Sequence, residues 1–256
     1  MTGQSYAGKT VLITGANGAI GTATAKMMAD RGAEIFAVDI PGTDWKAFRQ
    51  AVGHGDRVDT TEADVTRETD VKDYVIKAKT RFGKIDVFFN NAGIEGKYQE
   101  LPDLDIENLE TVFNVNVKGV VMGLKYVLPL MYAAGKGAVV NASSVAGLGG
   151  SPGLTPYIMS KHAVLGVTRT AALEAAAKGV RVNCVNPGPI DGRMMDSIND
   201  GQGGQQKMHD ATAAAIPMQR FGTPEEVAGL VAFLGSDDAG YCNGGFYTVD
   251  GAMTAA

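Results

Sequence analysis

A tyrosine and a lysine stand four positions apart at Tyr157 and Lys161. On a helix, side chains at this spacing share one face. A phenol normally titrates near pH 10, and an ammonium group about 4 Å away is worth roughly 4 kcal/mol at an effective dielectric constant near 20, or about three pKa units. The spacing therefore predicts that Lys161 lowers the pKa of Tyr157 into the range of a general acid or base.

The competing interpretation is a core tyrosine beside a lysine whose ammonium group reaches solvent. The helix expected here is apolar nearly all round, with Thr155 and Pro156 as its N-cap and first turn, so Lys161 should be largely buried. Ser144 stands 13 residues before Tyr157, at the end of an apolar run that resembles a strand. Ligands bind at the carboxyl ends of parallel strands, so Ser144 is placed to hydrogen-bond a reacting oxygen.

A glycine-rich turn follows the first apolar run and leads directly into a helix. Gly15 permits a tight turn, small residues at 18 and 19 let backbone amides approach a pyrophosphate, and Gly21 allows close helix packing. The amino end of the helix then faces the anion. The turn alone also suits an S-adenosylmethionine pocket or a purely structural connection.

Asp39 closes the second strand, 18 residues beyond Gly21. A carboxylate at this place accepts hydrogen bonds from the adenosine ribose hydroxyls and repels a 2′-phosphate. No arginine follows within Ile40-Pro41-Gly42. The sequence therefore favours NAD over NADP as the cofactor.

Short apolar runs alternate with longer amphipathic stretches along the whole chain. Strands are expected at 10–14, 34–39, 58–64, 85–90, 138–143, 180–186 and 246–250, and helices at 20–31, 44–51, 68–82, 106–134, 156–178 and 224–234. Runs that are apolar throughout suit strands buried on both faces of a parallel sheet. The fold class is therefore α/β, a Rossmann-type doubly wound sheet of seven parallel strands in a single domain spanning 1–256. Residues 191–215 break the rhythm with glycines and glutamines and are expected to form a substrate flap.

Composition excludes several other classes of function. The chain has 256 residues and a net charge of −5, which argues against nucleic acid as a partner. Its two cysteines and three histidines show no ligand spacing, so no metal site is expected. No leader-like segment and no run of about 18 apolar residues is visible, so we expect a cytoplasmic protein without a membrane span.

Taken together, the motifs identify a resemblance to the short-chain dehydrogenase/reductase family over essentially the whole chain. The matching segments are Thr14-Gly15 with Ala19-Ile20-Gly21, Asp64-Val65, Asn90-Asn91-Ala92-Gly93, Asn116-Val117-Lys118-Gly119, Ser144, Tyr157, Lys161 and Pro187-Gly188. The resemblance implies a catalytic tetrad of Asn116, Ser144, Tyr157 and Lys161, in which Tyr157 exchanges the proton, Ser144 polarises the oxygen and Asn116 positions a water beside Lys161.

The resemblance also implies the cofactor contacts. Asp64 and Val65 would contact adenine, residues 91–93 would line the cleft, and residues 187–190 would flank the nicotinamide. The full expected set is Gly15, Asn17, Ala19, Ile20, Gly21, Asp39, Ile40, Asp64, Val65, Asn91, Ala92, Gly93, Tyr157, Lys161, Pro187, Gly188 and Ile190. Many relatives carry threonine in place of Gly192, so the missing hydroxyl predicts a weaker grip on NAD, by about 1 kcal/mol.

The expected substrate pocket is mainly apolar, with Arg193 as its one nearby cation. Its residues are Glu95, Ser144, Leu148, Pro189, Met194, Met195 and Ile198. Such a lining predicts a neutral secondary alcohol or ketone, alicyclic or aromatic. The stretch from Phe89 to Lys97 is similar to the same stretch in levodione-type cyclic ketone reductases.

Three alternatives stay open at this point. A 3-oxoacyl thioester reductase of the same family should prefer NADP and carry basic surface, which Asp39 and the acidic balance disfavour. A non-catalytic NAD-sensing protein would have no need of the tetrad, and a methyltransferase has no use for Tyr157 with Lys161.

Small residues on the helices expected at 106–134 and 156–178 favour self-association, and the resemblance implies a homotetramer.

Overall fold

The computed structural model describes residues 5–201 and 205–255 and confirms the expected sheet. Seven parallel strands are arranged in the order β3-β2-β1-β4-β5-β6-β7. Their bounds are β1 Thr10–Thr14, β2 Glu34–Asp39, β3 Val58–Glu62, β4 Val87–Asn90, β5 Gly137–Ala142, β6 Val180–Pro187 and β7 Phe246–Val249. The strand order reverses between β1 and β4, and ligands of doubly wound sheets bind at the carboxyl side of such a reversal.

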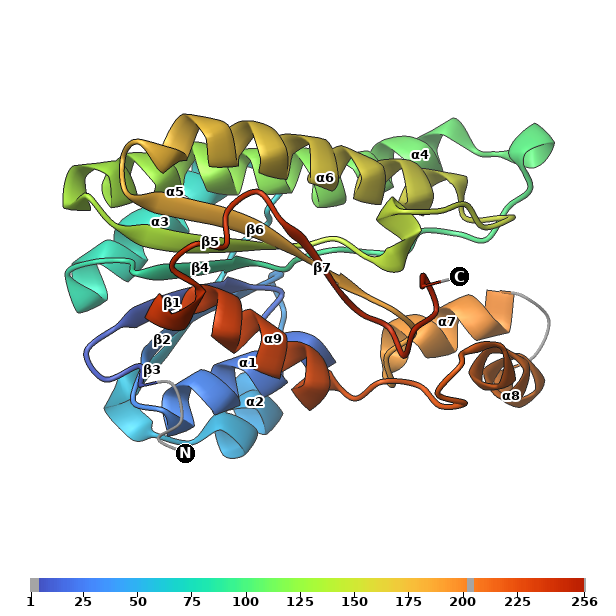
Figure 1. Cartoon of the computed structure of the whole chain (residues 1–256), viewed down its shortest axis with the longest axis horizontal. Coiled ribbons are helices and arrows are strands. Elements are labelled where there is room, and N and C mark those ends of the chain that lie inside the picture. The colour runs from blue at the N-terminus through green and yellow to red at the C-terminus, as the bar shows by residue number, and fades with distance from the viewer. Residues whose placement is uncertain (1–4, 202–204, 256) are drawn as a thin grey trace.

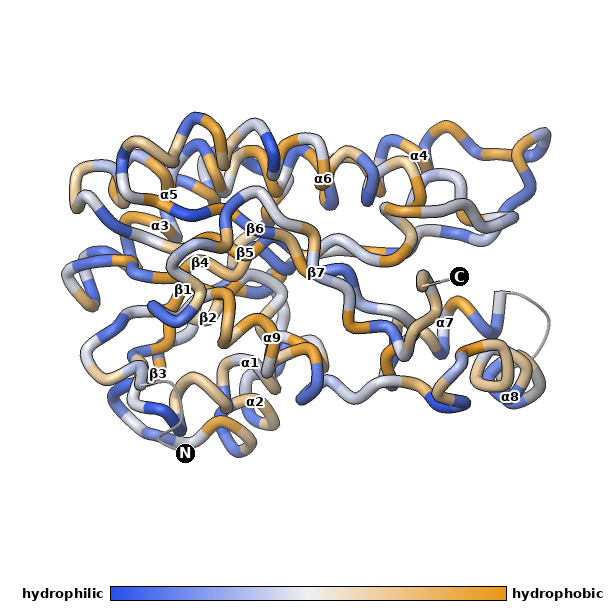
Figure 2. The backbone as a smooth tube through the Cα atoms, in the orientation of Figure 1, coloured by the Kyte–Doolittle hydropathy of each residue, from blue (hydrophilic) through white to orange (hydrophobic). Residues whose placement is uncertain are grey.

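Helices cover both faces of the sheet (Figure 1). One layer holds α1 (Ala19–Asp30), α2 (Trp45–Val52) and α9 (Pro224–Gly235), and the other holds α3 (Glu68–Phe82), α4 (Ile106–Phe113), α5 (Val120–Ala134) and α6 (Thr155–Ala176). Alternate residues of β1 serve the two cores, since Leu12 packs on one side while Val11 and Ile13 pack on the other. Figure 2 shows hydrophobic residues along the central strands and α9, as a sheet buried on both faces requires.

The helix expected at 106–134 is interrupted where the tetrad asparagine lies. A π-helical turn, Asn114–Gly119, separates α4 from α5. Such turns are rare and often occur at functional sites. By length and composition, Ile106–Ala134 is apolar enough to cross a membrane. In this fold the stretch packs against α3, α6 and the sheet, so it is a core helix.

The start of α6 differs by one residue from the expectation. The helix begins at Thr155, and the residue before it, Leu154, makes no side-chain cap. Thr155 is therefore not the N-cap, while Pro156 does lie in the first turn. Tyr157 and Lys161 are both buried on this helix, as its apolar surroundings predict.

The segment 191–215 is largely helical rather than irregular. It contains α7 (Arg193–Gly201) and α8 (Gln205–Ala215), while residues 202–204 lie outside the described residues. Both helices lie beyond the carboxyl ends of the strands, near the C-terminal end of the chain (Figure 1). The glycines and glutamines favoured an irregular segment, although the spacing of Met194, Met195 and Ile198 suits one helical face.

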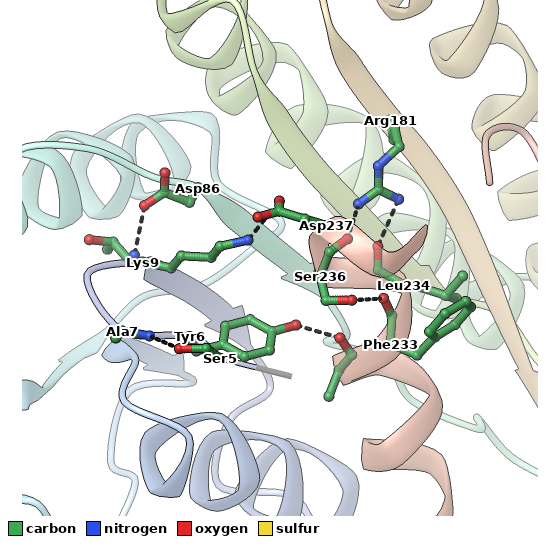
Figure 3. A network of polar contacts seen from close by, with 12 residues as sticks. Ser5, Tyr6, Ala7, Lys9, Asp86, Arg181, Phe233, Leu234, Ser236 and Asp237 are labelled. Carbon is green, nitrogen blue, oxygen red and sulfur yellow. Dashed lines mark hydrogen bonds and ion pairs between the residues drawn. The ribbon is translucent and has the colours of Figure 1, made fainter. Parts of the chain in front are cut away.

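A polar network closes the opposite, amino edge of the sheet (Figure 3). The guanidinium of Arg181, at the start of β6, donates to the carbonyls of Leu234 and Ser236, each at 2.8 Å. The Tyr6 hydroxyl donates to the carbonyl of Ala232. These carbonyls belong to the last turn of α9 and the residue after it, where helical acceptors lack partners. The network therefore satisfies the end of a buried helix.

Candidate functional site

A single large cleft of about 1190 Å³ opens at the carboxyl edge of the sheet. It lies where the strand order reverses, with walls from the glycine-rich turn, the end of β2, α6 and α7. Of the residues predicted from the sequence, it is lined by Gly15, Asn17, Ala19, Ile20, Gly21, Asp39, Ile40, Asn91, Gly93, Ser144, Leu148, Tyr157, Lys161, Pro187, Gly188, Pro189, Ile190, Met194, Met195 and Ile198. The fold thus brings the predicted chemistry and the predicted phosphate turn into one cavity.

The glycine-rich turn has no room for a side chain at Gly15 or Gly21. Gly15 has a φ of +62°, and a Cβ there would lie 2.9 Å from the Cα of Ala92. A Cβ on Gly21 would lie 2.3 Å from the carbonyl oxygen of Gly15. The amide of Asn91 donates to the carbonyls of Thr14 and Gly15, both at 3.0 Å, and holds the turn. The cradle therefore fits a pyrophosphate approached by backbone amides.

Asp39 keeps hydrogen-bonding capacity for a ligand. One carboxylate oxygen accepts from the backbone N–H of Asn17 and the other from that of Ile40, both at 2.8 Å. A carboxylate offers about four acceptor positions. The side chain is thus fixed in place beside the turn, with positions left for two vicinal hydroxyls of a ribose.

Tyr157 and Lys161 are both buried, with 8% and 4% of their surfaces exposed. The Lys161 ammonium donates to the carbonyl of Ala142 at 3.0 Å and lies 5.4 Å from the centre of the Tyr157 ring. Burial raises the pKa of Tyr157 to about 12, against a lowering by its hydrogen bond with Ser144. Burial also lowers the pKa of Lys161 to about 8.

These directions overturn the expected effect of Lys161 on the Tyr157 pKa in the protein alone. The sequence argument placed the ammonium about 4 Å from the phenol at high dielectric constant. In the fold, burial is the largest cause acting on the pKa of each group, because the charged form of each loses its hydration.

The Ser144 side chain lines the cleft and is held in place by two backbone groups. Its hydroxyl accepts from the backbone N–H of Ala146 at 3.1 Å and donates to the carbonyl of Pro187 at 3.4 Å. Its hydrogen bond with Tyr157 is one of the causes acting on the tyrosine pKa. The serine and tyrosine hydroxyls therefore converge on one place, where a reacting oxygen can lie.

Asn116 is buried next to the cleft but does not line it. Its amide oxygen accepts from the N–H of Ile94, and its amide nitrogen donates to the carbonyl of Ile94, both at 2.8 Å. The nitrogen also donates to the hydroxyl of Ser160 at 3.0 Å. A Cβ on Gly93 would come within 3.4 Å of both the Asn116 side chain and the Lys161 ammonium. Asn116 therefore ties the loop after β4 to α6 beside Lys161.

Glu95, on the same loop, lies close enough to Tyr157 for its charge to act on the tyrosine. It is 8% exposed, and its carboxylate lies 3.7 Å from the guanidinium of Arg193 on α7. Its charge raises the pKa of Tyr157, after the larger effects of burial and Ser144. The Tyr157 hydroxyl also lies 3.9 Å from the sulfur of Met194. The pocket beside the tyrosine is thus apolar with one buried carboxylate at its edge.

A family model described as enoyl-(acyl carrier protein) reductase matches residues 15–254. The chain belongs to the short-chain dehydrogenase/reductase family. Cyclohexanol dehydrogenase of Acinetobacter sp. strain SE19 is 38% identical over 98% of this chain and 97% of its own. Levodione reductase of Leifsonia aquatica is 38% identical over 98% and 96% of the two chains. A 3-oxoacyl-[acyl-carrier-protein] reductase of Thermotoga maritima is 38% identical over 96% and 98%.

Solved structures agree with the family. A crystal structure of levodione reductase superposes with a TM-score of 0.94 over 98% of this chain and 99% of that one, at 38% identity. That of NAD⁺-bound xylitol dehydrogenase superposes with a TM-score of 0.89 over 96% and 99%, at 32% identity. This short-chain dehydrogenase/reductase is therefore an enzyme that uses a nicotinamide cofactor and a small-molecule substrate.

Five residues predicted for the site do not line the cleft. Asp64 accepts from the N–H and hydroxyl of Thr66, at 2.9 and 2.8 Å, and the Val65 side chain packs against Gly119 of the π-helical turn. Ala92 lies behind the glycine-rich turn, while Glu95 and Asn116 act from behind the wall of the cleft. Their predicted contacts with cofactor or substrate stay predictions.

Gly192 has a structural reason to be glycine. Its φ is +147°, and a Cβ there would lie 3.3 Å from the Cβ of Ala19. A threonine at this position would be strained, whatever it gained from the carboxamide. A Gly192→Thr variant therefore cannot test whether the missing hydroxyl weakens the binding of NAD to this protein.

Sequence reasoning missed several residues of the cleft. Leu154, Ile158 and Thr212 line it, and so does Asn199, which is 1% exposed. Asn199 follows Met195 by four positions, so a helix over 193–201 would have placed both on one face. Within the described residues, no group of three or more His, Cys, Asp or Glu side chains is placed to hold a metal ion.

Proposed function

We propose that this enzyme transfers hydride between NAD(H) and a neutral cyclic secondary alcohol or its ketone. The observation that carries the proposal is the Tyr157 hydroxyl, hydrogen-bonded to Ser144 and facing the sulfur of Met194 in a mainly apolar pocket. Such a pocket offers a proton donor to one oxygen and apolar walls to a ring. The similar cyclohexanol dehydrogenase and levodione reductase act, by their names, on molecules of this kind.

The side chains of the site divide the proton chemistry among them. NAD, when bound, supplies the hydride acceptor. Ser144 holds the substrate oxygen. Tyr157 takes the alcohol proton during oxidation as the tyrosinate, after losing its own proton, and donates a proton as the phenol during reduction. Lys161, anchored by the carbonyl of Ala142, would hold the nicotinamide ribose with its remaining N–H groups. Asn116 positions Lys161 and the loop of Glu95 through its bonds to Ile94 and Ser160.

Asp39 supports NAD as the cofactor rather than NADP. Its carboxylate stands beside the amide of Asn17 at the start of the phosphate turn. A 2′-phosphate placed there would meet a negative charge, while a free ribose diol would meet an acceptor. The negative charge of Asp39 at the adenosine end of the cleft thus favours NAD over NADP.

A 3-oxoacyl thioester reductase is the second candidate, favoured by the 38% identity to the Thermotoga maritima enzyme. An acyl carrier is acidic and needs basic surface, whereas this chain has a net charge of −5. The buried Glu95 beside the pocket also disfavours an anionic substrate. A protein that only senses NAD would leave the Tyr157, Ser144 and Lys161 arrangement without a purpose.

The experiment offers cyclohexanol with NAD or NADP and follows the ultraviolet absorbance of the reduced cofactor. We expect NADH to accumulate together with cyclohexanone, and NADP to give a far lower rate. A 3-oxoacyl thioester and a charged hydroxy acid serve as competing substrates. Turnover of either of these, with none of cyclohexanol, would contradict the proposal.

We also infer that the enzyme is a homotetramer. Large apolar side chains are exposed on the long helices of one layer, including Val121 on α5 and Met159 and Leu173 on α6, the last 82% exposed. Isolated exposed apolar residues are common, but three on neighbouring helices support self-association. Light scattering on purified protein tests this inference. A cytoplasmic location stays a prediction.

A further inference from the structure

A buried carboxylate close enough to the catalytic tyrosine to act on it has a single partner. Glu95 has 8% of its surface exposed. In residues 5–201 and 205–255 no group donates a hydrogen bond to this carboxylate, and Arg193 is the one cation within ion-pair distance of it. A charge taken out of water is costly unless it is paired. Glu95 therefore depends on Arg193 for the balance of its charge.

The ion pair connects two segments of the site that are distant in the sequence. Glu95 belongs to the loop that follows β4, and Arg193 is the first residue of α7. The guanidinium lies 3.7 Å from the carboxylate, and Arg193 also lines the cleft. The next residue, Met194, brings its sulfur to 3.9 Å from the Tyr157 hydroxyl. The pair thus lies where the start of α7 meets the catalytic tyrosine.

The other end of α7 rests on the same loop through a separate contact. A Cβ on Gly201 would lie 2.9 Å from the Cβ of Tyr98. The helix therefore stays attached to the loop when Arg193 is replaced. The Arg193 side chain is 78% exposed, and an ion pair with so exposed a partner adds little to stability. The main consequence of losing Arg193 is thus a change of charge around Glu95.

The groups that act on the Tyr157 hydroxyl come from three other places in the fold. Lys161, on the same helix, lies 5.4 Å from the centre of the tyrosine ring. Burial is the largest cause that raises the pKa of Tyr157, the hydrogen bond with Ser144 lowers it, and the charge of Glu95 raises it again. Arg193 is not among these causes, so it acts on the tyrosine through Glu95.

We propose that Arg193 is a positioning residue of the reaction, which balances the buried charge of Glu95 and so favours the tyrosinate that accepts the alcohol proton. This inference rests on the proposed function and deepens it. A negative charge near a phenol disfavours its ionised form, and a cation beside that charge reduces the effect. Arg193 thereby influences the pH at which Tyr157 becomes competent for oxidation.

The test is the pH profile of kcat/KM for the oxidation of cyclohexanol by NAD. In Arg193→Met the rise with pH should move by about 0.5 pH unit to higher pH, because the charge of Glu95 is no longer balanced. This is a loss of about threefold on the rising limb, and it should vanish on the alkaline plateau. Arg193→Lys keeps the positive charge and should restore most of the wild-type profile.

Two further variants separate the charge of Glu95 from other effects. In a Glu95→Gln background, Arg193→Met should move the profile no further, because the charge that Arg193 balances is gone. Lys97→Met removes a cation from the same loop, where it pairs with Asp105 at 3.5 Å, and should leave the profile in place.

The outcomes distinguish this inference from the proposed function. An unchanged profile in Arg193→Met, an equal loss at every pH, or the same displacement in the Glu95→Gln background would overturn the role of Arg193 and leave the proposed function standing. An equal displacement in Lys97→Met would do the same. If the wild-type enzyme oxidised no cyclohexanol at any pH, both would be overturned.

Discussion

Polar groups are buried at both edges of the sheet, but the two edges differ in how many hydrogen-bond acceptors they provide for the buried donors. At the amino edge the Arg181 guanidinium and the Tyr6 hydroxyl donate to carbonyls at the end of α9 (Figure 3). At the carboxyl edge Lys161 has one carbonyl, and the Asn199 amide nitrogen has no partner in the described part of the chain. The edge that binds ligands is the one left incomplete.

The buried cations show the difference most clearly. Burial lowers the pKa of Arg181, but the guanidinium keeps its charge and spreads its donors over the carbonyls of Leu234, Ser236 and Cys242. Burial lowers the pKa of Lys161 to about 8, and within residues 5–201 and 205–255 the one acceptor of its ammonium is the carbonyl of Ala142. The donors of Arg181 complete the end of helix α9, whereas those of Lys161 are proposed to serve the Tyr157 oxygen and the nicotinamide ribose.

The largest effect should come from Tyr157→Phe. The change removes the hydroxyl that exchanges the proton and leaves the ring in place, so the oxidation rate should fall about a thousandfold. Binding of NADH, followed by its fluorescence, should remain. Tyr126→Phe, on α5 and away from the cleft, is the control and should keep the wild-type rate. A Tyr157→Phe enzyme within tenfold of wild type would remove Tyr157 from the mechanism.

Arg181→Met should lower the free energy of unfolding by disrupting the hydrogen bonds at the amino edge of the sheet. It leaves the carbonyls of Leu234 and Ser236 without their charged donor, and bonds of this kind are worth about 1.5 to 3 kcal/mol each. Denaturant unfolding should show a loss of about 3 kcal/mol. Arg67→Met removes an exposed ion pair with Asp70 and should cost less than 1 kcal/mol. Equal losses in the two variants would mean that the network of Figure 3 contributes no special stability.

Asp39→Ala should change the choice of cofactor. Removing the carboxylate takes away the repulsion of a 2′-phosphate and the acceptor for the ribose, so the preference for NAD over NADP in kcat/KM should fall about a hundredfold. Glu62→Ala is the control, because Glu62 pairs with Asp39 across the strands without lining the cleft. An unchanged preference in Asp39→Ala would show that another residue discriminates between the cofactors.

Lys161→Met should stabilise the protein alone while it abolishes turnover. The folded-state pKa of Lys161, about 8, lies below its ordinary value of 10.5, so its charge is destabilising. The cost is full below pH 8, where both states are protonated, and fades between pH 8 and 10.5 as the unfolded state alone keeps the proton. Unfolding free energies should show a gain of about 3 kcal/mol at pH 7 and less than about 1 kcal/mol at pH 10. A loss of stability at pH 7 would contradict this electrostatic picture.

The sequence predicted what depends on local pattern. Strand ends, the glycine-rich turn and Asp39 are all read from neighbouring residues, and the fold brings them to one edge as a parallel sheet must. The π-helical turn at Asn114–Gly119 has no sequence period of its own, so one continuous helix was expected there. The pKa of Tyr157 depends on burial by distant segments, which spacing cannot reveal.

Helix α7 was missed because the segment was interpreted from its amino-acid composition and not from the helical spacing of its apolar residues. The glycines and glutamines near 201–206 favoured an irregular segment, although residues 193–201 form a helix. That choice hid Asn199, because only a helical register places it on the face of Met195. Its missing partner is visible only in three dimensions.

Thermal unfolding with and without cofactor tests most directly whether the carboxyl edge is left incomplete for NAD. At a concentration one hundred times its Kd, a ligand that binds only the folded state adds about 2.7 kcal/mol. For a chain of this size that is a rise in Tm of roughly 5 to 10 °C. We expect this rise with NAD and a much smaller one with the same concentration of NADP. No rise with NAD, or equal rises with both, would contradict the account.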